Sequence, residues 1–245
     1  MRKPKTHSIL ILDKSGSMEG YKTDADGIGD IRKRTLNDYN EKVQMYQEEA
    51  KIGEQEVLAC FVTFNGHLDE HLWLVPAEQL KLGTLEDYKP EGGTALNDAI
   101  VYTLSKAEET IKLEDDDAVF VTILTDGDEN ASRKYPRPKG DLMVKQLIKR
   151  LEDKKNSKGQ QQWTITYMGA NQDVEEVAER YGIQHSNCAV YKSTDAASAG
   201  FAYNNYNTRV KKYLRSRTQG VTASGNFVSD DNEVADWTCQ PKDSK

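Results

Sequence analysis

The residues Ile9-Leu10-Ile11-Leu12-Asp13-Lys14-Ser15-Gly16-Ser17 show most directly how this chain folds. A short, continuous apolar run is typical of a strand that is buried on both faces of a parallel sheet, and the Gly/Ser turn after Asp13 ends it. Two later runs have the same form, because residues 119–124 end at Asp126-Gly127 and residues 163–168 end at Gly169. These runs predict parallel strands in an α/β sheet.

Helical stretches separate the predicted strands. Apolar residues at i, i+3, i+4 and i+7 spacing predict a helix over residues 96–111, and a second stripe predicts one over residues 36–50. Shorter helices are predicted over residues 142–151 and 174–181, and a last helix over residues 197–214. Because strands and helices alternate, right-handed crossovers should place helices on both faces of a doubly wound sheet.

One segment interrupts the alternation. Residues 57–64 and 68–75 both have the composition of strands, but only Asn65-Gly66-His67 joins them. This link is too short for a parallel crossover, so the two runs should form an antiparallel hairpin at one edge. With a further strand expected at residues 189–191, the prediction is a doubly wound, mostly parallel six-stranded sheet with one antiparallel edge strand.

Length and charge limit the kind of protein this is. The chain has 245 residues, which suits one large domain, and we expect that domain to span residues 1–215. Residues 216–245 are polar and acidic, which predicts a flexible tail with an acidic cluster from Asp230 to Asp236. The formal net charge of −7 at pH 7 argues against nucleic-acid binding, because a phosphate backbone is held mainly by excess Lys and Arg.

Cysteine usage and hydropathy bear on the compartment. Cys60, Cys188 and Cys239 are widely spaced and odd in number, so they predict neither a disulfide framework nor a paired-cysteine zinc motif. The apolar run after the basic N-terminus is far shorter than a signal-peptide core or the roughly 20 residues of a membrane span. We therefore expect a cytoplasmic protein that does not enter the membrane.

Polar residues gather at the expected carboxyl ends of the strands, where α/β sheets bind their ligands. Three segments carry oxygen-bearing side chains: Asp13-Lys14-Ser15-Gly16-Ser17, Gly92-Gly93-Thr94 and Thr125-Asp126-Gly127-Asp128. In an extended turn the odd positions of the first segment can point the same way, and Gly16 lets the backbone curl. Thr94 can also cap the helix that begins near Ala95.

The chemistry of this set indicates a hard cation. Two of their carboxylates, from Asp13 and Asp126, and three of their hydroxyls, from Ser15, Ser17 and Thr94, can converge on one point, and the segments contain no His or Cys. Oxygen ligands with few carboxylates suit Mg2+, which usually keeps some of its waters, and disfavour zinc. Mn2+ and Ca2+ are alternatives to Mg2+. Asp128, Glu129 and Asn130 follow directly, and we interpret them as a solvated loop in preference to support for the ligands.

The order of Asp-x-Ser-x-Ser, Gly-Gly-Thr and Thr-Asp-Gly resembles the metal-ion-dependent adhesion site of von Willebrand factor A domains, which integrin I domains also carry. The resemblance covers roughly residues 6–215, and residues 124–133 and 167–171 look more particularly like small stand-alone bacterial members. It implies a metal site formed by these residues: Ser15, Ser17 and Thr94 as hydroxyl ligands, with Asp13 and Asp126 acting directly or through water. The link Glu19–Arg34 is longer than the family pattern.

The predicted function is cation-dependent protein binding, in which the ion accepts an Asp or Glu side chain from a partner protein. A metal-dependent hydrolase or phosphotransferase is the alternative among enzymes, but no histidine is well placed as a base and the position two residues after Asp13 is Ser15. A self-associating scaffold, with the acidic tail occupying the metal site, is the third hypothesis. The oligomeric state is left open.

Overall fold

The computed structural model describes residues 2–22, 25–191, 196–224, 227 and 235–236. Its strands form one sheet in the order β3-β2-β1-β4-β5-β6-β7, parallel throughout except for β3. The strands are β1 (Lys5–Asp13), β2 (Glu56–Phe64), β3 (Leu68–Pro76), β4 (Ala118–Thr125), β5 (Trp163–Ala170), β6 (Cys188–Tyr191) and β7 (Ala235–Asp236). The predicted α/β fold with an antiparallel edge strand is confirmed, and the short β7 adds to the six predicted strands.

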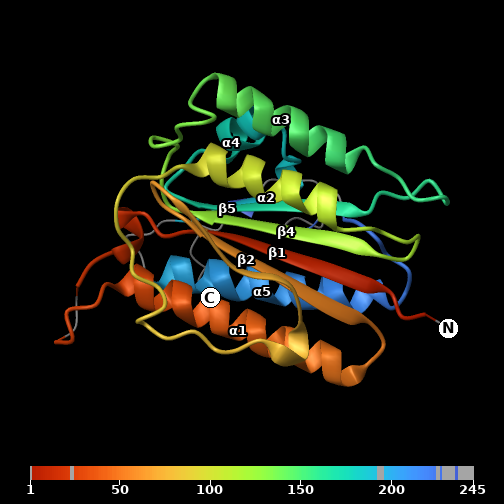
Figure 1. Cartoon of the computed structure of the whole chain (residues 1–245). Helices are drawn as coiled ribbons and strands as arrows, with labels where there is room; N and C mark the ends of the chain where they lie inside the picture. Colours follow the sequence, from red (N-terminus) through yellow and green to blue (C-terminus); the bar gives the residue numbers. More distant parts are fainter. Residues whose placement is uncertain (1, 23–24, 192–195, 225–226, 228–234, 237–245) are drawn as a thin grey trace, which may run out of the picture.

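Helices cover both faces of the sheet (Figure 1). They are α1 (Asp30–Ile52), α2 (Leu96–Thr110), α3 (Lys139–Glu152), α4 (Val174–Tyr181) and α5 (Ala196–Arg217). The alternation of side chains along β1 divides the apolar residues into two cores, because Ile9 and Ile11 pack with α2, α3 and α4 while Leu10 and Leu12 pack with α1 and α5. Within the described ranges, no helix is long and apolar enough to cross a membrane.

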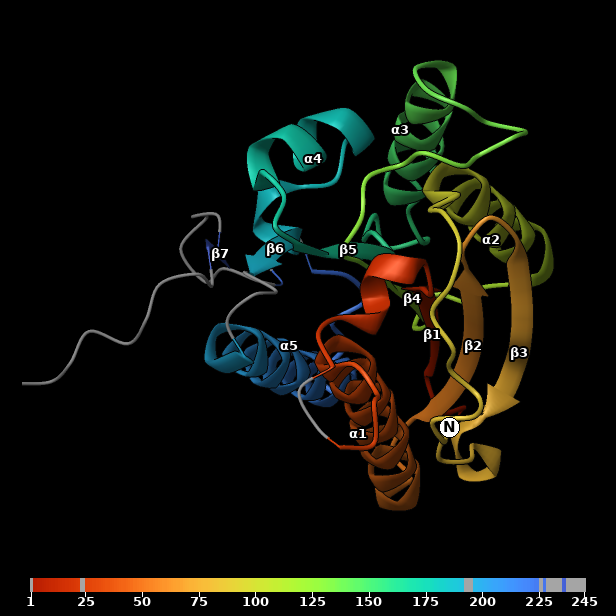
Figure 2. The same cartoon turned by 90° about the vertical axis from the view of Figure 1, so that its left-hand side faces the viewer.

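The strand order reverses beside β1. The chain continues from β1 to β2 on one side of it, while β4 pairs with β1 on the other, in register from Thr6 opposite Ala118 to Leu12 opposite Leu124. The residues that follow Leu12 and Leu124 therefore leave the sheet side by side. Such a reversal is where ligands bind in open α/β sheets, and η1 (Gly16–Glu19) lies at this edge in the centre of Figure 2.

The packed structure continues past the predicted domain boundary. The Thr222 hydroxyl donates to the Gln161 carbonyl at 2.6 Å, and the ring of Phe227 lies 4.9 Å from that of Phe120. Thr222, Ser224 and Phe227 therefore contact the sheet and α5 beyond the boundary predicted at residue 215. The acidic cluster Asp230–Asp236 lies outside the described residues, apart from the backbone of β7.

The buried carboxyl of Glu152, at the end of α3, should make the stability of the fold depend on pH. Burial raises the pKa of its carboxyl to about 7, so the folded state holds this proton more tightly than the unfolded state does. Stability should therefore fall as pH rises from about 4.5 to about 7, by about 1–3 kcal/mol from this group. We expect Glu152→Gln to lose that part of the pH dependence in urea unfolding. The exposed Glu109→Gln is the control; equal profiles for Glu152→Gln and the wild type would contradict the prediction.

Candidate metal centre

The turn after β1 brings the Asp-x-Ser-x-Ser side chains together. Asp13 is fully buried, and the Ser15 amide donates to its Oδ1 at 2.6 Å. This bond curls the backbone into η1, so the Oγ atoms of Ser15 and Ser17 lie 3.1 Å apart. Ser15 is buried and Ser17 is exposed. The turn thus presents two neighbouring hydroxyls, one of them at the surface.

The second segment pairs directly with this turn. The Gly16 amide donates to the Gly92 carbonyl at 3.0 Å, and the Glu91 amide donates to the Lys14 carbonyl at 2.8 Å. Gly92 has φ +74°, a backbone conformation that residues other than glycine rarely adopt. Two backbone bonds and this turn carry the chain to Thr94, whose side chain is buried against the third segment.

The third segment completes the cluster. Asp126 accepts a hydrogen bond from the Ser17 hydroxyl at 2.6 Å, and a Cβ atom on Gly127 would lie 2.9 Å from Thr94 Oγ1 and 3.7 Å from Ser17 Oγ. The structure therefore brings together all five residues that the sequence nominated: Asp13, Ser15, Ser17, Thr94 and Asp126. Asp128 lies at the surface in the same loop.

The electrostatics of the cluster favour a cation. Burial raises the pKa of Asp13 to about 7, despite hydrogen bonds from the Thr125 hydroxyl and the Ser15 amide, and burial also raises the pKa of Asp126. Lys14 lies between Asp13 and Ser15 in the sequence, but its ammonium pairs with the carboxylate of Asp69. Among the described residues, neither carboxyl has a cationic side chain as a partner. A bound cation would offset the cost of burying both charges.

The donor set fits a hard ion. In the part of the chain that the structure describes, no three His, Cys, Asp or Glu side chains are grouped so that they could hold a metal. A metal here would therefore bind through hydroxyls and two carboxylates, as Mg2+ does readily and zinc does rarely. Both Asp13 oxygens already accept protein hydrogen bonds, at 2.6 Å from Ser15 and 2.5 Å from Thr125. These two bonds fix the orientation of the Asp13 carboxylate beside the serine hydroxyls.

Glu129 contradicts the prediction of a solvated loop, whereas Asn130 is exposed as predicted. Glu129 is buried and accepts the Asn97 amide at 2.7 Å, so it caps α2 from a distant loop, while Thr94 makes no capping bond there. The Asn130 side-chain oxygen accepts the Thr94 backbone N–H at 2.9 Å, and the Asn130 backbone N–H donates to the Thr94 carbonyl at 3.0 Å. Both residues thus hold the segment that carries Thr94. The sequence around Glu129 and Asn130, directly after Thr-Asp-Gly, contains no pattern that predicts this role.

Tyr88 also supports the cluster and was not anticipated. Its buried hydroxyl donates to the Asp13 backbone carbonyl at 2.6 Å, across 75 residues of sequence. No periodicity or spacing around Tyr88 predicts such a bond. It ties the connection between β3 and α2 to the end of β1.

The link after η1 is shorter than predicted, because α1 begins at Asp30. Its two ends are joined at a neck, where the Asp30 amide donates to the Tyr21 carbonyl at 2.8 Å and the Gly29 amide donates to Glu19 Oε1 at 2.9 Å. A Cβ atom on Gly29 would lie 1.6 Å from the Glu19 carbonyl oxygen, so only glycine fits this close approach. The link therefore leaves and returns beside η1.

Comparison with known proteins assigns the fold. No family model and no curated protein matches the sequence. Solved structures do match: a von Willebrand factor type A protein from Catenulispora acidiphila (TM-score 0.53, 13% identity, 88% of this chain and 43% of that one), BatB from Bacteroides thetaiotaomicron (0.53, 12%, 87% and 99%) and the PilB minor pilin from Streptococcus sanguinis (0.52, 12%, 87% and 63%).

These likenesses show that the chain has the von Willebrand factor A fold, as the resemblance of its motifs implied. The chain spans 43% of the Catenulispora protein and 63% of PilB, so those proteins contain much that has no counterpart in the match. Their identities of 12–13% carry the fold and nothing finer.

Proposed function

We propose that this protein is a divalent-cation-dependent protein-binding module. The hydroxyls of Ser15, Ser17 and Thr94 would hold the ion, and Asp13 and Asp126 would balance its charge directly or through water. The observation that carries the proposal is the meeting of the three segments, in which Ser17 bonds to Asp126 and both Ser17 and Thr94 flank Gly127. Mg2+ is the preferred ion on the chemistry of these ligands, with Mn2+ and Ca2+ as alternatives.

The open side of the cluster supports binding in trans. Asp13, Ser15 and Thr94 are buried, whereas Ser17 is exposed and Asp126 is half-buried. An ion held between these groups would face solvent on the Ser17 side and would keep water there. An Asp or Glu side chain from a partner protein can replace such a water, because a carboxylate is a good ligand for a hard cation.

The surroundings of the cluster favour binding over catalysis. A hydrolase that used Ser15 or Ser17 as its nucleophile would need a base within hydrogen-bond reach. Of the described histidines, His71 bonds to Thr63 on the edge hairpin, and His7 is buried near the amino end of β1. Within the described residues, no histidine makes a hydrogen bond to the cluster. We therefore prefer the binding function to the enzymatic alternative.

Occupation of the site by the acidic tail has less support. The backbone of β7 pairs with β6, and the order β4-β5-β6-β7 puts that strand three places from β4. Neighbouring strands are about 4.8 Å apart, so Ala235–Asp236 runs roughly 14 Å from the strand that leads to Asp126. This placement disfavours that short segment as the occupant of the cluster.

Binding of acidic peptides tests the proposal. The protein should bind members of an immobilised peptide library that contain an Asp or Glu, should lose them in EDTA, and should recover them with Mg2+. The same peptides with Asn or Gln in place of the acid should fail to bind, because an amide carries no charge to the ion. Peptide binding that survives EDTA would place the interface elsewhere, and acid-independent binding would contradict carboxylate recognition.

A further inference from the structure

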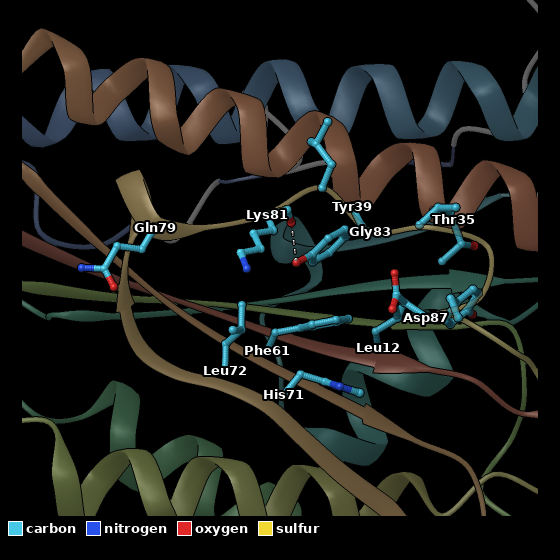
Figure 3. A pocket seen from close by; sticks show the side chains of 13 residues that line it. Leu12, Thr35, Tyr39, Phe61, His71, Leu72, Gln79, Lys81, Gly83 and Asp87 are labelled. Carbon is cyan, nitrogen blue, oxygen red and sulfur yellow. Dashed lines mark hydrogen bonds between the residues drawn. The ribbon is translucent and has the colours of Figure 1, made fainter.

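A cavity of about 420 Å3 opens on the face of the sheet that α1 covers. Its lining reaches the support of the metal cluster, because it includes Leu12, which precedes Asp13, and Tyr88, which bonds to the Asp13 carbonyl. It lies between α1, the β2–β3 hairpin and residues 80–88, which we call the strap (Figure 3). Volumes of about 300–1,000 Å3 are typical of sites for small organic ligands. The cavity is therefore large enough for a ligand with one or two fused rings.

The strap is fastened to α1 by side chains. Arg32 donates to the Tyr88 carbonyl at 2.7 Å and also to the Leu85 carbonyl, and Asn40 makes two bonds to the Gly83 backbone, at 2.8 and 3.2 Å. Gln47 holds the start of the strap through the Leu80 carbonyl at 2.9 Å. These bonds hold the strap above the hairpin, so the space beneath it is formed before any ligand arrives, which lowers the cost of binding.

The inner surface is aromatic and apolar. The rings of Tyr39 and Phe61 lie 4.7 Å apart, and those of Phe61 and His71 lie 5.0 Å apart with their planes inclined by 29°. Three rings from α1, β2 and β3 thus pack against one another in a row along the cavity, which we call the floor. The apolar part of the lining is completed by Leu12, Leu36, Leu72 and Leu82. Flat aromatic molecules stack favourably on such rings.

Two opposite charges border this floor. Lys81 and Asp87 reach it from the two ends of the strap, with the Phe61 ring between them in Figure 3. Lys81 has no ion-pair partner among the described residues, and Asp87 accepts the Thr84 amide and hydroxyl through Oδ2 alone, each at 2.7 Å. His71 is engaged through Nε2 with Thr63 at 2.7 Å. The cavity thus offers a cation at one end and an acceptor at the other.

We propose that this cavity binds a small, flat aromatic molecule that carries an acidic group at one end and a hydrogen-bond donor at the other. The rings of the ligand would lie on the Tyr39–Phe61–His71 floor. Its acidic group would pair with the Lys81 ammonium, and its donor would bond to the Asp87 carboxylate. None of the five proposed cation-site residues lines this cavity, and binding there needs no metal.

Calorimetry with 6-hydroxy-2-naphthoate in EDTA tests the proposal, because this probe has an acid and a donor on opposite sides of two fused rings. We expect saturable binding of one molecule per chain. Lys81→Gln should weaken it about tenfold, as expected for one lost charged contact. Lys89→Gln, at an exposed lysine just after the strap, should leave it unchanged. The Asp87→Asn variant should bind 6-hydroxy-2-naphthoate no more tightly than 2-naphthoate, which lacks the hydroxyl donor.

Leu72→Trp provides a second test that is independent of charge. The larger side chain should fill the space beneath the strap and abolish binding, while circular dichroism and the melting temperature report that the variant remains folded. Three results would overturn the proposal: no saturable binding at millimolar probe, equal affinity in Lys81→Gln and wild type, or full binding by folded Leu72→Trp. Because EDTA is present throughout, none of them bears on the cation-dependent function.

Discussion

Replacing Asp126 with alanine is expected to abolish the rise in melting temperature that Mg2+ produces in the wild-type protein. A ligand that binds only the folded state stabilises it by about 2.7 kcal/mol at 100 times its Kd. In a domain of this size that stabilisation corresponds to a shift of about 5–10 °C. Asp126 lies against Ser17 at the open side of the cluster, so its loss removes charge and an oxygen where the ion would sit. Differential scanning fluorimetry with and without Mg2+ measures the effect.

The matched control lies two residues away. Asp128 belongs to the same loop but is exposed and pairs with Arg180 at 3.1 Å, so Asp128→Ala should keep the full Mg2+ shift. Asp13→Asn should also lose the shift, because the amide lacks the charge that balances the ion. A wild-type protein with no shift, or an Asp126→Ala variant with a full one, would show that this cluster does not bind the cation.

Arg217→Ala is expected to lower the free energy of unfolding by about 3–5 kcal/mol. Arg217 is almost fully buried, and its guanidinium donates to the Thr6 hydroxyl at 3.1 Å and the Lys5 carbonyl at 3.2 Å. It donates further to the carbonyls of Asp116 and Val221. Alanine would leave these acceptors without their donor and would open a cavity at the amino ends of β1 and β4. Urea unfolding measures the loss.

Two further variants separate the causes. Arg217→Met keeps most of the apolar stem and removes the donors, so it should still be strongly destabilised if the hydrogen bonds matter. Lys211→Ala, six residues earlier on α5, removes one partner of an exposed ion pair with Glu48 and should cost no more than about 1 kcal/mol. If Arg217→Met unfolded at the wild-type urea concentration, the side chain would act by packing alone.

The fold follows from patterns that are local in sequence. The apolar runs ending at Asp13 and Asp126, and the three-residue link between β2 and β3, each report a nearby physical constraint, so they predicted parallel strands and an edge hairpin. The limits of the fold were harder to predict. Phe227 lies in a polar segment, and its burial depends on rings from β4 and α5 that no local pattern reveals.

Some residues of the candidate site could also be predicted from local sequence, and others could not. Ser15 and Ser17 follow Asp13 at a spacing that a single turn explains, and the fold brings Thr94 and Asp126 to the same edge. Glu129 was assigned to a solvated loop because a charged side chain between polar neighbours is usually exposed. Its burial is compensated by amides from α2 and from its own loop, which become neighbours only when the chain has folded.

The irregular edge strand β3 limits how a strand from another chain could pair with the sheet. The pairing of β3 with β2 shifts register near Phe61, Leu74 has φ 54°, and Pro76 ends the strand without an amide donor. Charged residues, Asp69 and Glu70, stand at the beginning of β3. Bulges, charges and proline discourage another strand from adding to an open edge. Along β3, growth into fibrils and recognition by strand addition are therefore both disfavoured.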